Sequence, residues 1–362
     1  MSFRSSPLFS GDLYDSALRL AASPDVPRQQ GQGHAQAGDK WQHMLALGWQ
    51  GVLVAEEDGG VGARLQEVAA IVEAAARQGQ AVPLADRCAV SPILLTAARA
   101  HPEAADLLSA ITMGEASVCP AWGSSEVGSG HEHGPVLGAD GVLMGTLSAL
   151  DMSEPATHIL LHAHDVTTQE SVLVLLQWAQ VAAAARHHVG VDERQYTDLA
   201  LDGLQVTDQQ VLLRGAAAAD AVTRARHAGS LLTCVEAVGA AAAMIELTID
   251  YLNTRVPQLV RDARAQGHTV SLALVDLDNF RHINAELGHL AGDRALRHAV
   301  KVLRKELARE EPMIRVGGEE FVLVLRLPIG AAWERLEVLR RKLEAAPFVP
   351  EAGVEPRRLT LS

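Results

Sequence analysis

Cysteine, basic charge and long apolar runs are all scarce in this chain of 362 residues. The three cysteines are Cys88, Cys119 and Cys234; their odd number and wide spacing exclude a disulfide framework or a zinc cluster and indicate a reducing compartment. No uninterrupted apolar run reaches the roughly 20 residues that span a bilayer, and the N-terminus lacks a signal-peptide pattern. These absences predict a cytoplasmic protein with no membrane partner.

Acidic residues outnumber basic residues by 44 to 31, which gives a formal net charge of -13. Such a chain has no basic surface with which to bind a nucleic-acid backbone, so nucleic acid is excluded as a partner. A small phosphorylated ligand held through a metal ion remains compatible with this charge. The length and the 48% hydrophobic content allow two or three domains with substantial cores.

The sequence pattern divides the chain into four parts. Residues 1–118 predict an all-α domain with helices over 41–47, 65–77, 91–100 and 103–113. Residues 119–214 predict a small β-domain with strands over 142–144, 158–161 and 172–176. Residues 215–256 are rich in alanine and predict one long helix, which Pro257 interrupts. Residues 257–362 alternate helices and strands, as an α+β domain does.

Two pairs of carboxylates lie at strand ends in the last part. Asp276 and Asp278 follow the apolar run 271–275, and Glu319 and Glu320 lie at the tip of a predicted hairpin whose strands are 313–316 and 321–325. If the two strands are neighbours, Asp276 and Glu319 meet, and paired carboxylates of this kind hold hard divalent cations. The alternative for Asp276 is an ordinary solvated strand end.

The first 250 residues resemble the acyl-CoA dehydrogenase family. The resemblance rests on three segments: Leu47-Gly48-Trp49 followed by Glu56-Glu57-Asp58-Gly59-Gly60, the stretch 194–206, and the stretch from Glu236 to Arg255. It implies a helical domain, a β-barrel-like domain and the first helix of a four-helix bundle, the framework that binds FAD and an acyl-CoA thioester. Ser124, Ser125 and Ser129 are the candidates for flavin-phosphate contacts, although a Ser/Gly loop can simply be a turn.

The last 100 residues resemble the GGDEF family of diguanylate cyclases. Four linked motifs carry the resemblance, in the family's order and spacing: 276–284, Gly288-His289, Gly292-Asp293 and Gly317-Gly318-Glu319-Glu320-Phe321. It implies a ferredoxin-like α/β sandwich that joins two GTP molecules into cyclic di-GMP with release of pyrophosphate. Each domain of the family holds one GTP, so a homodimer is implied.

The resemblance also implies roles for individual residues. Asp276, Glu319 and the Leu277 carbonyl would hold Mg²⁺, in a two-metal site once two domains meet, with Asp276 and Glu319 as the catalytic carboxylates. Gly317 and Gly318 would let the main chain approach the phosphates, because no Cβ is in the way. Asn284 and Asp293 would read the guanine base. For Asp293 the alternative is the N-cap of a helix from Arg294 to Leu307.

Both resemblances are truncated. The dehydrogenase bundle stops after one helix, so no residue can be assigned as its catalytic base, and the family's Trp-Ile-Thr segment is replaced by Thr146-Leu147-Ser148-Ala149. The cyclase resemblance stops at the strand over 359–362, and its Arg-x-x-Asp inhibitory site has no match in 307–312.

The leading hypothesis from the sequence is a diguanylate cyclase fused to an acyl-CoA dehydrogenase-like module. One alternative is an FAD-dependent acyl-CoA dehydrogenase. Another is a catalytically inactive fusion that binds GTP or acyl-CoA.

Overall fold

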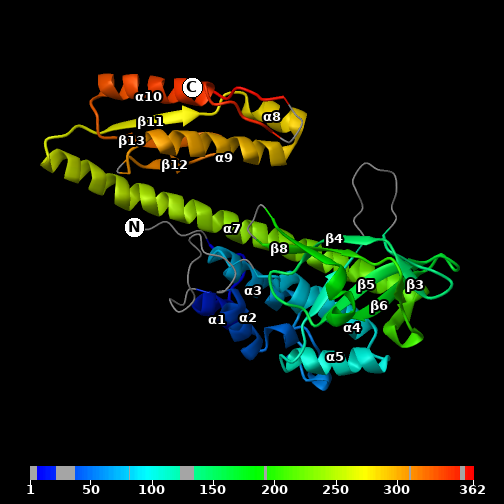
Figure 1. Ribbon diagram of the computed structural model, residues 1–362. Helices are drawn as coiled ribbons and strands as arrows, with labels where there is room; N and C mark the ends of the chain where they lie inside the picture. The colour runs from blue at the N-terminus through cyan, green and yellow to red at the C-terminus, as the bar shows by residue number, and fades with distance from the viewer. Residues whose placement is uncertain are drawn as a thin grey trace. The chain divides into compact units, whose positions relative to one another are not determined.

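The computed structural model describes residues 6–21, 37–80, 82–122, 134–190, 194–309, 311–350 and 355–362. The chain forms two compact units, Ser6–Ala243 and Met244–Ser362. One long helix, α7 (Gly215–Ala265), contributes residues to both units (Figure 1).

The N-terminal unit begins with helices that pack on one another through small and branched side chains. They are α1 (Asp12–Ala21), α2 (Ala37–Ala46), α3 (Leu65–Arg77), α4 (Ser91–Ala97) and α5 (Pro102–Thr112), with short helical turns at Trp49–Gly51 and Glu56–Asp58 and a π-helical turn, η3 (Asp86–Val90). Helix α3 buries an almost continuous run from Val68 to Ala76, because alanines allow close approach on several sides. The predicted helical domain is therefore present.

Two sheets follow the helices in the same unit. The larger has the order β10-β6-β5-β2-β3-β9, with β1 paired to β5, and the smaller has the order β4-β8-β7. Their bounds are β1 (Val118–Ala121), β2 (Val136–Leu137), β3 (Val142–Met144), β4 (Thr146–Asp151), β5 (His158–Asp165), β6 (Ser171–Gln177), β7 (Ala185–Val189), β8 (Gln195–Ala200), β9 (Leu204–Gln205) and β10 (Val211–Arg214); a short helix α6 (Trp178–Val181) follows β6.

Alternating side chains from both sheets meet in one core. Leu143 and Ile159 come from the larger sheet, Leu147 and Leu199 from the smaller, and all four are fully buried. The opposite face of the larger sheet packs on α4, α5 and the start of α7 through residues such as Leu160 and Leu173. The two sheets around one core agree with the predicted β-barrel-like domain.

The C-terminal unit is an α+β sandwich. Its sheet is antiparallel with the order β11-β13-β12, formed by β11 (Ser271–Asp276), β12 (Met313–Arg315) and β13 (Glu320–Leu325). Its helices are α8 (Phe280–Leu287), α9 (His289–Glu306) and α10 (Ile329–Glu344), and their apolar residues share one core with the sheet. The prediction of a hairpin between β12 and β13 and of a strand before Asp276 is confirmed.

One face of this sheet carries the core. Val275 lies opposite Phe321 and Ala273 opposite Leu323, and these side chains pack with apolar residues of α9 and α10. Residues one position away point to the other face, where Leu272 and Leu274 are 60% and 66% exposed. Successive side chains of a strand point to opposite faces, and this alternation explains which positions are buried.

Helix α7 differs from the prediction at Pro257. The helix continues through this proline to Ala265, although the ring removes one backbone donor and strains the preceding turn. Leu259 and Ala263, which follow the proline, are almost fully buried, and their packing favours continuation of the helix. The expectation that Pro257 interrupts the helix is therefore wrong. The domain boundary between residues 256 and 257 stays a prediction.

Among the described residues, α7 is also the one helix long and apolar enough to cross a membrane, with a mean hydropathy of 1.7 over an 18-residue window. The search for uninterrupted apolar runs in the sequence missed it, because polar residues interrupt the stretch. Length and composition alone are weak evidence for a membrane span, since core helices pass the same test. Leu232 and Val235 of this helix do pack in the core of the N-terminal unit.

Candidate functional site

The acidic hairpin tip is held by its own backbone and by one arginine. The Val316 and Gly317 N–H groups both donate to the Glu320 carbonyl, at 3.0 and 3.4 Å. Arg315, the last residue of β12, donates from Nε to the Gly317 carbonyl at 3.1 Å and from Nη2 to the Gly318 carbonyl at 2.7 Å. The tip therefore has a fixed shape, with Glu319 between the glycine pair and the start of β13.

Neither glycine of the tip has a backbone conformation that only glycine adopts. Neither Gly317 nor Gly318 is among the residues with a positive φ. A Cβ at Gly317 would lie 2.2 Å from Oε2 of Glu320, whereas a Cβ at Gly318 would meet nothing within 4 Å. At Gly318 neither the turn nor the packing requires glycine, and the open main chain is accessible to a ligand.

Strand pairing brings the two predicted carboxylate positions to the same end of the sheet. In the antiparallel ladder of β11 and β13, Asp276 lies opposite Glu320, and the Leu277 N–H donates to the Glu319 carbonyl at 3.1 Å. The prediction that the two strands are neighbours is confirmed. The main chain of Asp276 is fixed from the other side as well, because it exchanges hydrogen bonds of 2.8 and 3.1 Å with Ser362.

Arg281 is a neighbour of this site that the sequence analysis did not identify. Its Nε lies 3.6 Å from Oε1 of Glu319, and its side chain is 95% exposed. An exposed ion pair of this kind contributes little to stability, so a metal ion can displace it. The only signal in the sequence was a basic residue five positions after Asp276, in the first turn of α8.

The donors at this end of the sheet suit Mg²⁺ bound together with a nucleotide. The described residues contain no group of three or more His, Cys, Asp or Glu side chains that could hold a metal ion alone. Asp276 and Glu319 supply carboxylates, and the Leu277 carbonyl, which accepts only a long 3.4 Å bond from the Phe280 N–H, adds a third oxygen. Mg²⁺ commonly uses one or two carboxylates and completes its shell with water and substrate phosphates.

The proposed base readers lie on two successive helices. Asn284 is on α8, and its Oδ1 is so close to α9 that a Cβ on Gly292 would lie 1.9 Å from it. This Oδ1 is buried, and no described residue hydrogen bonds to it. Asp293, the next residue after Gly292, is exposed. Asn284 thus has an amide oxygen with no partner among the described residues, and Asp293 has an exposed carboxylate; both groups can pair with a polar ligand edge.

The alternative role for Asp293 is excluded. Helix α9 begins at His289, after Gly288 with φ 80°, so Asp293 lies in the second turn of the helix and not at its N-cap. The prediction of a helix beginning at Arg294 placed the start too late, because Gly288 and not Asp293 marks the boundary.

The structure does not test the candidate flavin contacts, which stay a prediction. Ser124, Ser125 and Ser129 lie outside the described residues. In the stretch that replaces Trp-Ile-Thr, Leu147 points into the core, while Ser148 and Ala149 are exposed.

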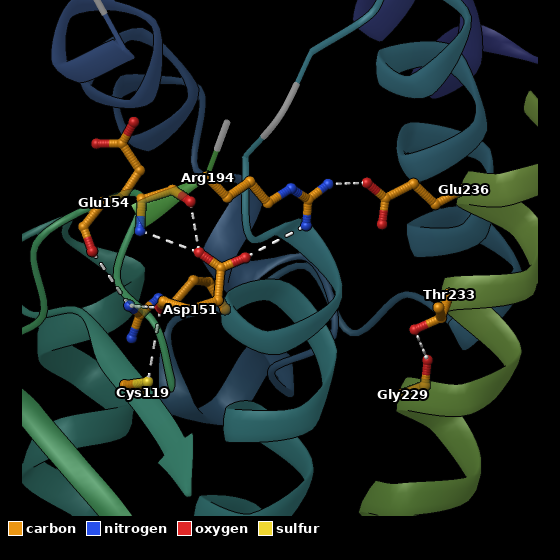
Figure 2. Close-up of polar contacts among 9 residues, drawn as sticks. Cys119, Asp151, Glu154, Arg194, Gly229, Thr233 and Glu236 are labelled. Carbon is orange, nitrogen blue, oxygen red and sulfur yellow. Dashed lines mark hydrogen bonds and ion pairs between the residues drawn. The ribbon is translucent and has the colours of Figure 1, made fainter. Parts of the chain in front are cut away.

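Asp151, the last residue of β4, forms an ion pair with Arg194 and hydrogen bonds with Ser153 (Figure 2). Its Oδ2 lies 3.3 Å from Nη1 of Arg194, and its Oδ1 accepts bonds from the Ser153 N–H and hydroxyl at 3.0 and 2.6 Å. Arg194 also contacts Glu236 of α7 through Nη2. Arg194 thus joins β4 to α7 within the N-terminal unit.

Beside this bridge lies a second arginine, Arg87 of η3, which is 1% exposed. It donates to the carbonyls of Asp151 and Glu154 at 3.4 and 3.3 Å. The Glu154 carboxylate is buried without a hydrogen-bond partner among the described residues, and burial raises its pKa to about 7. Burial also raises the pKa of Asp86 to about 6.

The charged side chains of Asp151, Arg194 and Glu236, drawn in Figure 2, thus pair with one another within the protein. Flavin binding by the N-terminal unit stays a prediction, because its candidate contacts lie outside the described residues.

Comparison with known proteins relates the C-terminal part of the chain to one family by sequence. Residues 250–362 match the family model described as diguanylate cyclase, GGDEF domain. The chain is 40% identical over 98 residues to diguanylate cyclase DgcP of Pseudomonas aeruginosa, which is 27% of this chain and 15% of that protein. It is 32% identical over 113 residues to response regulator PleD of Caulobacter vibrioides, which is 31% of this chain and 25% of that protein. The chain spans a quarter or less of these relatives.

Several solved structures of acyl-CoA dehydrogenases have a fold similar to this chain. Glutaryl-CoA dehydrogenase from Mycobacterium smegmatis matches with a TM-score of 0.55 and 16% identity, over 92% of this chain and 84% of that one. A glutaryl-coenzyme A dehydrogenase in complex with glutaryl-CoA matches with a TM-score of 0.56 and 15% identity, over the same shares. At this identity the likeness shows the fold alone. By sequence, residues 250–362 are similar to GGDEF domains, and by fold the greater part of the chain is similar to acyl-CoA dehydrogenases.

Proposed function

We propose that the C-terminal unit catalyses the Mg²⁺-dependent condensation of two GTP molecules into cyclic di-GMP. In this reaction each 3′-hydroxyl attacks the α-phosphorus of the other nucleotide, and each attack releases one pyrophosphate. The observation that carries the proposal is the β11–β13 register, which sets Asp276 and Glu319 at one end of the sheet beside the open main chain of Gly318.

The residues at this end have separate roles in the proposal. Asp276, Glu319 and the Leu277 carbonyl hold the metal ion, which neutralises charge on the phosphates when bound. Gly317 and Gly318 face the phosphates with their main chain. Asn284 and Asp293 pair with the guanine edge, and adenine would leave these groups without partners.

A second copy of the chain completes the proposed site. One domain holds one GTP in this scheme, whereas the product contains two guanosine units. The reaction therefore needs two domains that face each other, and we infer a homodimer with a metal site from each copy. The rate should then rise with the square of protein concentration below the dimer dissociation constant.

The direct test is incubation of the purified chain with labelled GTP and Mg²⁺. We expect cyclic di-GMP and two pyrophosphates for each molecule of product, and no product with EDTA. Absence of any cyclic dinucleotide from a demonstrably dimeric preparation would contradict the proposal and leave a GTP-binding module. For the N-terminal unit we propose a framework role, since the dehydrogenase alternative has only the fold in its favour.

Replacement of Asn284 by alanine should weaken the choice of GTP. We expect the KM for GTP to rise at least ~10-fold and the preference for GTP over ATP to fall by a similar factor, because a buried amide partner is lost. Steady-state kinetics with both nucleotides measure this. Asn253→Ala, an exposed asparagine on α7, is the matched control. An unchanged GTP preference in Asn284→Ala would remove Asn284 from base recognition.

A further inference from the structure

A cavity of about 640 Å³ lies within the C-terminal unit, away from the carboxylate pair. Its walls come from residues 247–259 of α7, the end of α9 with the loop that follows it, strand β12, and Arg326 just after β13. Part of the lining is apolar or aromatic, with Tyr251 and Leu259 from α7 and Met313 and Ile314 from β12. A volume of this size accommodates a ligand as large as a mononucleotide.

Five arginines line the same cavity: Arg255, Arg304, Arg309, Arg315 and Arg326. Within the described part of the chain, none of them forms an ion pair with a carboxylate within 4.0 Å. This concentration of positive charge is unusual in a chain whose net charge is -13.

The hydrogen bonds of these arginines leave their charge uncompensated. Arg304 donates to the Glu311 carbonyl at 2.8 Å, Arg315 donates to the carbonyls of the hairpin tip, and Arg255 contacts the Gln258 amide oxygen at 3.5 Å. All of these acceptors are neutral. The Nε of Arg326 is buried, and no described residue accepts a hydrogen bond from it.

Like charges that surround a common cavity repel one another, and an anion in the cavity offsets that repulsion. Guanidinium groups bind phosphate oxygens with two parallel hydrogen bonds and are the side chains best suited to this contact. The apolar and aromatic wall adds surface that favours a base or another flat apolar group. The two kinds of wall together define the chemistry of a ligand.

We infer that this cavity binds a small phosphate-bearing molecule that also carries an aromatic or apolar part. The site differs from the proposed GTP site, because neither Asp276 nor Glu319 lines it; Arg315, which also bonds to the hairpin tip, borders both. Its binding requires no divalent metal, since the cations are supplied by the arginines.

Isothermal titration calorimetry in the presence of EDTA tests this inference. ATP is the probe for the complete chemistry, and inorganic triphosphate is the probe for the phosphate part alone. We expect both to bind, ATP at least ~5-fold more tightly, and both to weaken as salt is raised. Failure of ATP and of triphosphate to bind the parent protein at low salt would overturn the inference.

Two double variants with the same change in charge test whether ATP binds in this cavity. Arg255→Ala/Arg309→Ala removes two exposed cavity arginines, and Arg261→Ala/Lys305→Ala removes two exposed cations on α7 and α9 that do not line the cavity. Both variants change the net charge equally, and circular dichroism checks that both fold. We expect ATP affinity to fall at least ~10-fold in the first variant and less than ~2-fold in the second. Equal losses in the two variants would show an unspecific charge effect and contradict the assignment.

Discussion

Glu319→Gln should reduce the conversion of GTP to cyclic di-GMP at least ~100-fold while the protein stays folded. The amide keeps the size of the side chain but loses the negative charge that holds Mg²⁺ next to Asp276, and the developing phosphate charge is then poorly neutralised. The side chain lies at a hairpin tip, and its one ion pair among the described residues is with the exposed Arg281, so its loss costs little stability. Product formation at saturating Mg²⁺ and the melting temperature measure the two effects.

Glu334→Gln is the matched control for this variant. Glu334 is an exposed glutamate on α10, and none of the described ion pairs includes it. We expect its activity and melting temperature to equal those of the parent. If Glu319→Gln retains the parental rate, Glu319 takes no part in the reaction; if it unfolds, the hairpin tip has a structural role that the contacts do not explain.

Arg194→Ala should lower the free energy of unfolding of the N-terminal unit by about 3 kcal/mol. Arg194 is the shared partner of Asp151 and Glu236, and the three side chains are 18%, 11% and 28% exposed. Its removal leaves two partly buried carboxylates without a cation and disconnects β4 from α7. Urea unfolding followed by tryptophan fluorescence reports the change, since Trp41, Trp49, Trp122 and Trp178 all belong to this unit.

The comparison variant is Arg224→Ala, which breaks an exposed pair with Asp220 on the surface of α7. Such a pair contributes about 0.3–0.5 kcal/mol, so this variant should be close to the parent. A similar small loss in Arg194→Ala would mean that the bridge in Figure 2 is mainly solvated and does not fasten the unit.

Local sequence patterns predicted the strands and the turn that carry the carboxylates of the C-terminal site. The apolar runs before Asp276 and after Glu320 have the length and composition of buried strands. Gly317 and Gly318, before the second run, mark a turn. Two such strands in a small domain pair readily, so the expected approach of Asp276 and Glu319 follows from short-range signals. The strand register in the structure agrees with it.

Features that depend on distant side chains could not be predicted in this way. Arg194 meets Asp151 and Glu236, which are 43 and 42 positions away, and no spacing rule links them. The five cavity arginines come from α7, α9, β12 and the segments after α9 and β13, so no local sequence pattern places them around one cavity. The helix through Pro257 also depends on packing of residues beyond the proline, which propensity does not describe.

Binding of Mn²⁺ as a substitute for Mg²⁺, measured by electron paramagnetic resonance with a non-hydrolysable GTP analogue, tests whether Asp276 and Glu319 share one ion. Asp276→Asn, Glu319→Gln and the double variant are compared with the parent. If one ion bridges both carboxylates, each single change weakens Mn²⁺ binding at least ~10-fold and the double change adds little more, because the two losses are coupled. Parental Mn²⁺ affinity in either single variant, or losses that multiply as for independent sites, would contradict the shared metal site.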